Sequence, residues 1–278
     1  MIVCLGSKSK IGSYICNKDH SIIKLNRNEL DLTQAKETEK KLAKILNKNS
    51  TVLFLATVNR LRKGLKRNFL DNISMAQNVG EVAKKTGARV VFLSSADIYG
   101  LNPPKPIDNK TKPFPECPYS KSKLMAEKTL RKLLPQQKLL ILRIPGIYGI
   151  PNDFDSTITK LIELVKNDRP IVLSNFGRTT RDYLFVDDLI SAFYHFQKTN
   201  FWGTWNLATG HSLRIVDYLN EICKELKLPA KAILDPKKQK RDYDLCYNLR
   251  NIKQHLPPGW PNKYWSCLKK ACRISHKS

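Results

Sequence analysis

The stretch at residues 2–12 reads IVCLGSKSKIG, and it decides the fold class. A short run of branched apolar residues, typical of a buried strand, leads directly into a glycine turn and then into a segment with helical spacing. Gly6 permits a tight turn, and Gly12 permits close packing of the helix on the strand. The N–H groups that open such a helix suit a pyrophosphate, so we expect a dinucleotide-binding loop here.

This predicted loop departs from the usual pattern in its middle position, where a glycine is replaced by Ser9. A serine side chain narrows the approach of the ligand to the backbone. The residues that we expect to contact the cofactor from this loop are Gly6, Lys8, Ser9, Lys10, Ile11 and Gly12.

The alternation of apolar runs and helical spacing continues from this loop to residue 142. We expect strands at 2–5, 21–25, 52–56, 90–93 and 139–142. The helices expected between them cover 11–16, 34–46, 70–85 and 119–134. Because parallel strands need crossover connections, this order predicts an α/β fold with a doubly wound parallel sheet of the Rossmann type.

The pattern loosens after Pro145. We expect helices at 154–166, 187–196 and 213–226 and short strands at 171–173 and 204–207. The predicted domains are therefore a dinucleotide-binding domain, 1–147 plus 187–203, and a smaller C-terminal α/β region that binds the substrate, 148–186 plus 204–278.

Composition points to a soluble intracellular protein of 278 residues. The seven cysteines are scattered and form no C-x-x-C pair, which indicates reduced thiols in the cytoplasm and no metal site. No signal peptide is visible, and no window approaches the ~18 consecutive apolar residues that span a membrane. We expect a cytoplasmic location and no membrane contact.

The net charge of +25 is unusual, and its densest basic runs lie at 60–67 and 237–241. Such charge suits nucleic-acid phosphates, a substrate that carries two phosphates, or simply a solvated surface. No combination of aromatic and basic residues typical of RNA-binding modules accompanies it. We favour the solvated surface together with an anionic substrate, and we expect no nucleic-acid partner.

The end of the second predicted strand bears on the choice of cofactor. It reads Leu25-Asn26-Arg27, without the acidic residue that would bind a ribose 2′-hydroxyl. Lys8 and Arg27 could together neutralise a 2′-phosphate instead. We therefore predict NADP(H) in preference to NAD(H).

Three residues form a candidate proton-transfer set. Tyr119 and Lys123 are four residues apart on a predicted helix and so share one face. Ser95 follows a predicted strand at its carboxyl end, where ligands bind in open α/β sheets. A phenol with a pKa near ~10 is a poor base, but a nearby ammonium favours its ionised form. Tyr119 could then exchange a proton with a sugar hydroxyl, with Ser95 holding the same oxygen.

Together these motifs resemble the extended branch of the short-chain dehydrogenase/reductase superfamily, whose members act on nucleotide-sugars. The resemblance covers nearly the whole chain. Besides the loop and the Tyr119-x-x-x-Lys123 pair, it rests on four segments: FLSSADIYG at 92–100, LR-x-P-x-x-YG at 142–149, RDY-x-x-VDD at 181–188, and WNL at 205–207.

The resemblance also implies roles for further residues. It places Asp31 and Leu32 near the adenine, Leu55 and Ala56 along the cofactor, and Asn72 as a support of the active site. On the substrate side it implies that Arg181, Arg241 and Asp244 bind the nucleotide diphosphate, since guanidinium groups match phosphate oxygens. Lys123 would also orient the nicotinamide ribose, and a homodimer is the expected assembly.

Departures from the family pattern narrow the reaction. Family dehydratases place an Asp-Glu pair directly after the active-site hydroxyl, whereas this chain has Ala96-Asp97, which disfavours dehydration. Ala96 also replaces the cysteine of fucose-synthase-like epimerase-reductases. Two reactions at the 4-position remain: reduction of a 4-keto-6-deoxy sugar by NADPH, which we favour, and 4-epimerisation with a retained cofactor. A non-catalytic NADP(H)- or nucleic-acid-binding module on the same fold is the alternative of a different class.

Overall fold

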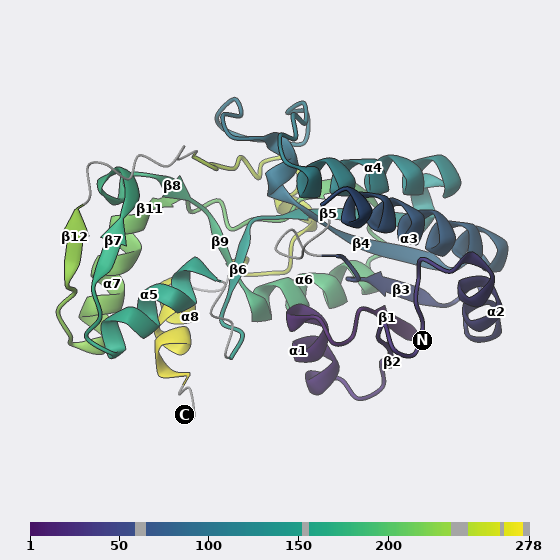
Figure 1. Ribbon diagram of the computed structural model, residues 1–278, viewed down its shortest axis with the longest axis horizontal. Coiled ribbons are helices and arrows are strands. Elements are labelled where there is room, and N and C mark those ends of the chain that lie inside the picture. The colour runs from purple at the N-terminus through teal and green to yellow at the C-terminus, as the bar shows by residue number, and fades with distance from the viewer. Residues whose placement is uncertain (59–64, 152–155, 235–243, 262–263, 275–278) are drawn as a thin grey trace. The chain divides into compact units, whose positions relative to one another are not determined.

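A computed structural model describes residues 1–58, 65–151, 156–234, 244–261 and 264–274. The chain folds into two compact units (Figure 1). Unit 1 comprises Met1–Gly100, Lys112–Arg143 and Phe196–Trp205, and unit 2 comprises Leu101–Thr111, Ile144–His195 and Asn206–Ser278. Compared with the predicted domain ranges, residues 101–111, 144–147 and 187–195 group with unit 2, and residues 204–205 group with unit 1. Which ligand each unit binds stays a prediction.

Unit 1 is built on a six-stranded sheet with the order β10-β5-β4-β3-β1-β2. The strands are β1 (Ile2–Leu5), β2 (Ile23–Leu25), β3 (Thr51–Phe54), β4 (Arg89–Ser95), β5 (Leu139–Ile144) and β10 (Gly203–Asn206). The neighbours β2, β1, β3 and β4 pair in parallel, with Val3 of β1 opposite Ile23 and Val52. The predicted Rossmann-type sheet is thereby confirmed.

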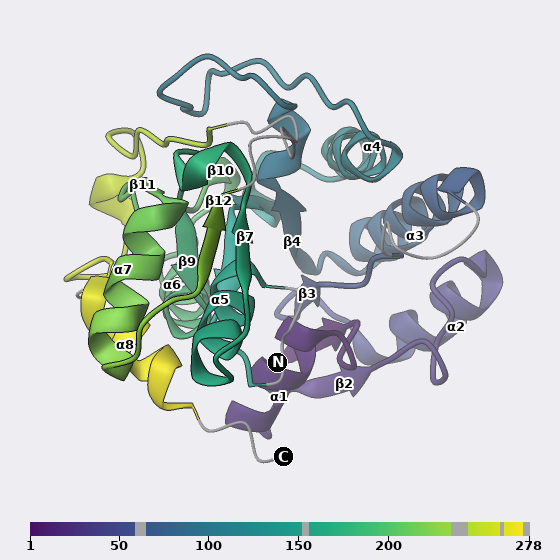
Figure 2. The ribbon, with the colours of Figure 1, turned by 60° about the vertical axis from the view of Figure 1, so that its left-hand side comes forward.

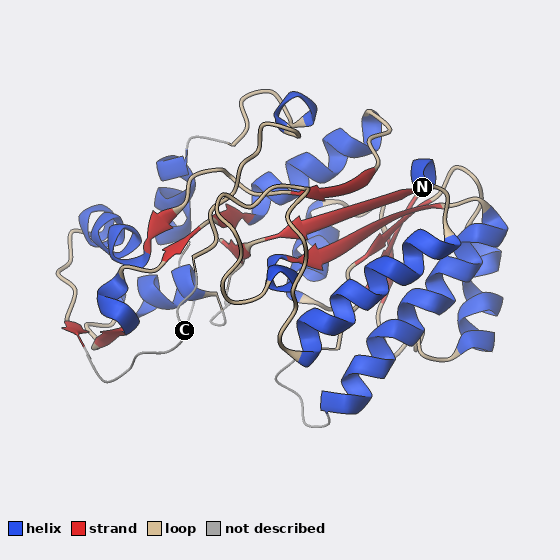
Figure 3. Ribbon diagram, turned by 90° about the horizontal axis from the view of Figure 1, so that it is seen from above, coloured by secondary structure: helices blue, strands red, loops and turns tan. Residues whose placement is uncertain are grey.

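The helices of unit 1 connect these parallel strands. They are α1 (Lys10–Lys18), α2 (Ala35–Ile45), α3 (Leu65–Thr86) and α4 (Pro118–Leu133). Helix α3 packs between α2 and α4, as Figure 2 shows, and α3 and α4 run along the strands in Figure 3. Alternate strand residues such as Val90 and Phe92 are buried in one core with Val79 and Leu130 of these helices. Burying each such side chain stabilises the fold by about 1.5–3 kcal/mol.

Unit 2 contains shorter elements around a second core. Its helices are α5 (Thr157–Lys166), α6 (Val186–Lys198, up to His195), α7 (Ile215–Leu226) and α8 (Tyr264–Arg273). Its strands form three pairs: β6 (Gly146–Tyr148) with β9 (Tyr183–Phe185), β7 (Ile171–Leu173) with β12 (Ala232–Leu234), and β8 (Thr180–Arg181) with β11 (Leu213–Arg214). The core joins Ile158 and Ile162 of α5 to Ile222 of α7 and Leu268 of α8.

The structure differs from the sequence prediction at several places in unit 2, where strands β6, β8, β9 and β12 were not expected. The predicted helix 213–226 begins at Ile215, because Leu213 and Arg214 pair with β8 instead. The C-terminal region, for which no element was expected, contains helix α8. Within the described ranges, no helix combines the length and apolar character needed to cross a bilayer.

Candidate active site

The loop between β1 and α1 has the geometry of a phosphate cradle. Gly6 has a φ of +92°, and a Cβ at this position would lie 2.6 Å from the backbone nitrogen of Ala56. A Cβ on Gly12 would lie 2.3 Å from the carbonyl oxygen of Gly6. Both positions therefore require glycine for steric reasons. The tight turn holds the start of α1 against the carboxyl end of β1, the arrangement that presents helix N–H groups to a phosphate.

Ser9 explains how the loop tolerates a serine in place of the middle glycine. It is the N-cap of α1, and its Oγ accepts a hydrogen bond from the backbone N–H of Gly12 at 3.1 Å. Its backbone N–H donates to the carbonyl of Gly6 at 2.9 Å. The side chain is thus used to begin the helix, as serine often is. Lys10 and Ile11 form the first two positions of that helix.

A cavity of about 260 Å³ lies beside this loop in unit 1. Seven of the predicted cofactor residues line it: Gly6, Lys8, Ser9, Arg27, Asp31, Leu32 and Ala56. The other seven, Lys10, Ile11, Gly12, Leu55, Asn72, Tyr119 and Lys123, are not among its lining residues. Leu55 is buried, and its N–H donates to the carbonyl of Leu5 at 2.9 Å. The cavity combines the glycine cradle with two cations, so it fits the phosphates and adenosine of a dinucleotide.

Arg27, one of the two cations predicted to bind the 2′-phosphate, has an ion-pair partner within the chain. Nη2 of Arg27 lies 3.3 Å from Oδ2 of Asp31, and both side chains are substantially exposed. Partial burial of Asp31 favours its neutral form, but the hydrogen bonds from Thr33 and the charge of Arg27 outweigh it and hold the pKa below its usual value. An ionised carboxylate therefore stands beside Arg27 at the end of β2.

Asn72 connects α3 to the loop after β3 and to α4. Its Oδ1 accepts a hydrogen bond from the backbone N–H of Val58 at 2.8 Å. Its Nδ2 donates to Oγ of Ser122 at 3.1 Å, and the Ser122 hydroxyl donates to the carbonyl of Tyr119 at 2.7 Å. The asparagine is buried, so these bonds are protected from water. Its position suits the supporting role that the resemblance implies.

The three candidate proton-transfer residues come from β4 and α4. Ser95 is the last residue of β4, and its Oγ accepts a hydrogen bond from the N–H of Asp97 at 3.2 Å. Helix α4 begins at Pro118, with Cys117 as its N-cap. Tyr119 is therefore in its first turn, half-buried, and Lys123 follows one turn later. This agrees with the predicted arrangement on one helix face.

Lys123 is buried, and its Nζ donates to the carbonyl of Leu93 at 2.9 Å. It also lies 4.8 Å from the centre of the Phe92 ring. Burial lowers the pKa of Lys123 to about 8, while the charge of Glu127 acts in the opposite direction. The ammonium of Lys123 is thereby hydrogen-bonded to β4, at a residue two positions before Ser95.

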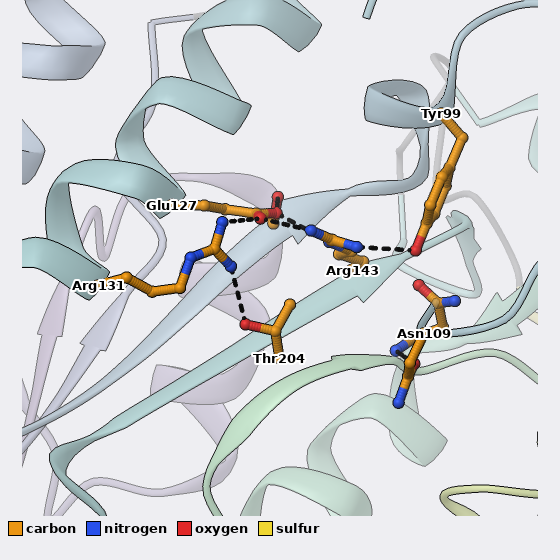
Figure 4. Close-up of polar contacts among 8 residues, drawn as sticks. Tyr99, Asn109, Glu127, Arg131, Arg143 and Thr204 are labelled. Atoms are coloured by element: carbon orange, nitrogen blue, oxygen red, sulfur yellow. Dashed lines mark hydrogen bonds and ion pairs between the residues drawn. The ribbon is translucent and has the colours of Figure 1, made fainter. Parts of the chain in front are cut away.

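A buried polar network surrounds this part of the sheet (Figure 4). Glu127 lies one turn after Lys123 and accepts a hydrogen bond from the Ser94 hydroxyl at 2.6 Å. Arg143 of β5 donates to both oxygens of Glu127, at 3.1 and 2.8 Å. The other end of its guanidinium donates to the Tyr99 hydroxyl at 3.0 Å, in the short helix η1 (Ala96–Tyr99). Charge-assisted pairs of this kind are strong and directional.

Unit 2 carries two of the predicted substrate residues, Arg181 and Asp244, whereas Ser95 belongs to unit 1. Arg181 lies in β8 and lines a cavity of about 660 Å³ together with Thr157, Lys160 and Tyr183. Thr179 also lines it, and its buried hydroxyl has no hydrogen-bond partner among the described residues. Two cations and several hydroxyl groups give this cavity the chemistry expected of an anion site.

Asp244 is engaged by its own unit. Its Oδ1 accepts a hydrogen bond from the Thr180 N–H at 2.8 Å, and its Oδ2 pairs with Nζ of Lys105 at 2.7 Å. Burial favours the neutral form, but these bonds and the charge of Arg181 outweigh it and lower the pKa of Asp244. The carboxylate thus supports the strand of Arg181. Arg241, its predicted partner, lies outside the described residues.

Two buried acids were not singled out by the sequence analysis. Glu127 follows Tyr119 and Lys123 at the same four-residue interval, which is the signal that could have found it. Asp182 follows Arg181 and accepts three hydrogen bonds, two from Thr209 and one from the N–H of Gly210. Burial raises the pKa of Asp182 to about 6, against the effect of these donors.

The chain is similar in sequence to enzymes named for their action on dTDP-linked sugars. It is 26% identical over 142 residues to human dTDP-D-glucose 4,6-dehydratase, which covers 50% of this chain and 41% of the dehydratase. It is 26% identical over 208 residues to dTDP-4-dehydro-6-deoxyglucose reductase of Escherichia coli, covering 70% and 65%. The chain spans between 26% and 65% of the length of four such relatives.

Solved structures share the fold over nearly the whole chain. A dTDP-4-dehydrorhamnose reductase from Bacillus anthracis in complex with NADP superposes with a TM-score of 0.81 at 16% identity, covering 97% of both chains. A UDP-N-acetylglucosamine 4-epimerase from Methanobrevibacter ruminantium superposes with a TM-score of 0.81 at 20% identity, covering 98% of this chain and 97% of the epimerase.

The family assignment rests on a match that extends from the first strand past the end of β10. The pattern of the NAD dependent epimerase/dehydratase family matches residues 2–208. That range includes the glycine loop, Ser95 and the Tyr119–Lys123 pair, on which the resemblance to extended short-chain dehydrogenases/reductases was founded. The chain therefore belongs to the NAD dependent epimerase/dehydratase family.

Proposed function

We propose that this protein is an NADP(H)-dependent oxidoreductase that acts at the 4-position of a nucleotide-sugar, reducing a 4-keto-6-deoxy sugar. The observation that carries the proposal is the buried ammonium of Lys123, one helical turn after Tyr119 and hydrogen-bonded to Leu93 at 2.9 Å. A buried lysine is costly unless its charge is used. Here it lies one helical turn after Tyr119, whose phenol could exchange a proton.

In this mechanism the residues of unit 1 handle the proton. Tyr119 donates its phenolic proton to the keto oxygen of the sugar, while Ser95 donates a hydrogen bond to the same oxygen. The positive charge of Lys123 stabilises the phenolate that remains on Tyr119. When bound, the nicotinamide cofactor supplies the hydride for the carbon. General acid catalysis of this kind contributes about 10²–10⁴-fold to the rate.

The residues of the cavity in unit 1 support a cofactor with a 2′-phosphate. Lys8 and Arg27 both line it, at the loop and at the end of β2. Two cations suit a phosphate dianion, and Arg27 can form paired hydrogen bonds to its oxygens. On the substrate side, Arg181 and Lys160 would bind the diphosphate in the cavity of unit 2.

One observation favours a second candidate, a 4-epimerase with a retained NAD(H). Asp31 lines the same cavity and is ion-paired with Arg27. An ionised carboxylate at this place could accept hydrogen bonds from ribose hydroxyls and would repel a 2′-phosphate. The charge balance at the end of β2 thus separates the two candidates.

The decisive experiment is an assay of the purified protein with NADPH or NADH and a panel of dTDP- and UDP-linked sugars. The panel pairs 4-keto-6-deoxy sugars with the corresponding 4-hydroxy sugars. We expect one NADPH consumed per keto-sugar reduced. Interconversion of 4-hydroxy sugars without net cofactor change would identify the epimerase. Binding of NADPH without any turnover of the panel would contradict both and favour a non-catalytic module.

The assembly is a separate part of the proposal. We propose a homodimer formed through α3 and α4, the long helices that pack side by side in unit 1. The exposed Met125 and Leu70 lie on these helices and provide apolar surface. Sedimentation of the purified chain at micromolar concentration, with Met125→Lys as the disrupting variant, tests it.

A further inference from the structure

Glu127 is fully buried, yet it touches neither of the two cavities described above. Its carboxylate holds three elements of unit 1 together. It accepts hydrogen bonds from Ser94 at the end of β4 and from Arg143 of β5, and it is itself part of α4. The same end of β4 is bound a second time, because Nζ of Lys123 donates to the carbonyl of Leu93.

These contacts leave little freedom to the residues of the proposed proton transfer. Ser95 follows directly on Leu93 and Ser94, which are tied to α4 through Lys123 and Glu127. Tyr119, Lys123 and Glu127 are spaced by four residues along one face of α4. A displacement of β4 along α4 would therefore have to break both bonds at once.

The charges near Lys123 can be named element by element. Glu127 on α4 is the anion that acts on it. Arg143 from β5 and Arg131 from α4 both pair with Glu127, at 2.8 and 3.3 Å. From η1, Tyr99 accepts a hydrogen bond from Arg143. Lys123 thus depends on a carboxylate that is shared with two guanidinium groups.

We propose that Glu127 is a positioning residue: it fixes Ser95 relative to Tyr119 and Lys123, and its charge keeps Lys123 protonated at neutral pH. The proposal rests on the proposed function for its link to turnover, but its electrostatic part concerns unit 1 alone. Loss of the carboxylate would leave Lys123 buried and without the anion that acts on it. Burial already lowers the pKa of Lys123 to about 8. A small further fall in this pKa would therefore deprotonate part of the Lys123 population at neutral pH.

The test uses Glu127→Gln, which keeps the size of the side chain, and Glu127→Asp, which keeps its charge. The matched control is Glu39→Gln, which removes a carboxylate from an exposed pair with Lys85 in the same unit. Carbon-13 labelling of lysine, with the Lys123 signal assigned through Lys123→Arg, reports the titration of this amine without any substrate. We expect its midpoint to fall by about one pH unit in Glu127→Gln, and to stay unchanged in Glu39→Gln.

Kinetics then tests the positioning part of the proposal. In Glu127→Gln we expect kcat at neutral pH to fall at least ~10-fold and the KM for the sugar to change less than ~3-fold, because the loss arises in the transition state. The alkaline limb of the kcat profile should move to lower pH together with the Lys123 midpoint. Glu127→Asp should recover part of kcat and restore the limb.

A second variant covers the case in which Glu127→Gln does not fold. Arg131 is partly exposed, so Arg131→Gln should fold, and it removes one of the two cations that share Glu127. We expect the Lys123 midpoint to rise by about 0.3 unit in this variant. An unchanged midpoint in folded Glu127→Gln, or a fall in Arg131→Gln, would overturn the proposal. A wild-type protein without turnover would refute the proposed function, while the titration would still decide the role of Glu127.

Discussion

Each unit of this protein contains a fully buried carboxylate, and the two are held in opposite ways. Glu127 in unit 1 is paired with the guanidinium of Arg143, so its charge is neutralised inside the core. Asp182 in unit 2 receives three hydrogen bonds, all from neutral donors of Thr209 and Gly210. A buried charge without a counter-ion costs free energy even when it is well hydrogen-bonded.

This contrast between the two carboxylates indicates that unit 1 and unit 2 contribute to different parts of the proposed reaction. The ion pair in unit 1 joins β5 to β4 and α4, the two elements that carry the residues of the proposed proton transfer. Asp182 instead organises the turn at residues 209–210 next to the strand of Arg181. We therefore expect substitutions in unit 1 to act on kcat and substitutions in unit 2 to act on KM. Substitutions in each unit test this difference between effects on kcat and effects on KM, and they are given in order of decreasing expected effect.

Tyr119→Phe should cause the largest loss. Removing the proton donor is expected to lower kcat by about 10³-fold, while the Kd for NADPH changes less than ~3-fold because the phenyl ring remains. Steady-state kinetics and cofactor fluorescence measure the two quantities. Tyr14→Phe on α1 is the matched control and should leave both unchanged. A variant with nearly wild-type kcat would place the proton donor elsewhere.

Asp182 predicts a pH dependence of the free energy of unfolding. Its pKa is raised from 3.8 in the unfolded chain to about 6 in the fold, so the protonated form is favoured in the native state. Its stabilising contribution is complete below about pH 4 and is lost as the pH rises through about 6, which amounts to as much as about 3 kcal/mol.

Urea unfolding at several pH values measures this slope. In Asp182→Asn, which cannot ionise, the free energy of unfolding should vary less between pH 4 and 6 than in the wild type. Equal slopes in both proteins would mean that Asp182 is ionised throughout this range, as its three donors alone would favour.

Arg181→Ala tests the proposed role of unit 2 in substrate binding. We expect the KM for the nucleotide-sugar to rise by about 10–150-fold, since a guanidinium bound to a phosphate contributes about 1.5–3 kcal/mol. The kcat at saturation should stay within ~3-fold. Arg214→Ala, which removes an exposed arginine paired with Asp217, serves as the control. A loss confined to kcat would contradict the division between the units.

Arg27→Ala is expected to have the smallest effect, and it concerns the choice of cofactor. The Kd for NADPH should rise about 10-fold, the loss of one charge-assisted contact, while the Kd for NADH stays nearly constant. The control is Lys24→Ala, which removes an exposed cation of β2 three residues before Arg27. Equal effects on both cofactors would favour NAD(H), with Asp31 as the ribose ligand.

Much of unit 1 could be predicted from the sequence because its signals are local. The glycine loop, the strand–helix alternation and the spacing of Tyr119 and Lys123 each lie within a few consecutive residues. The partners of Glu127 could not be predicted in this way. Ser94 and Arg143 are 33 and 16 residues distant in sequence, and only the packing of β4, β5 and α4 brings them together.

Unit 2 shows the same limit more strongly. Leu213 and Arg214 have apolar and basic side chains compatible with the helix that follows, yet they form a strand because they pair with β8, more than thirty residues away. Asp244 stays a predicted ligand of the substrate, but the contacts of its carboxylate with Thr180 and Lys105 could not be read from the sequence. Such contacts depend on tertiary structure, which overrides local propensity.

The proposed function depends most on hydride transfer to the sugar C4 with Tyr119 as the proton donor. Turnover of the active keto-sugar with NADPH that carries deuterium at the nicotinamide C4 tests this directly by mass and NMR spectroscopy of the product. We predict one deuterium at the sugar C4 of the wild-type product, and incorporation about 10³-fold slower in Tyr119→Phe at equal cofactor occupancy. A product without deuterium, or equally fast incorporation in both proteins, would contradict the account.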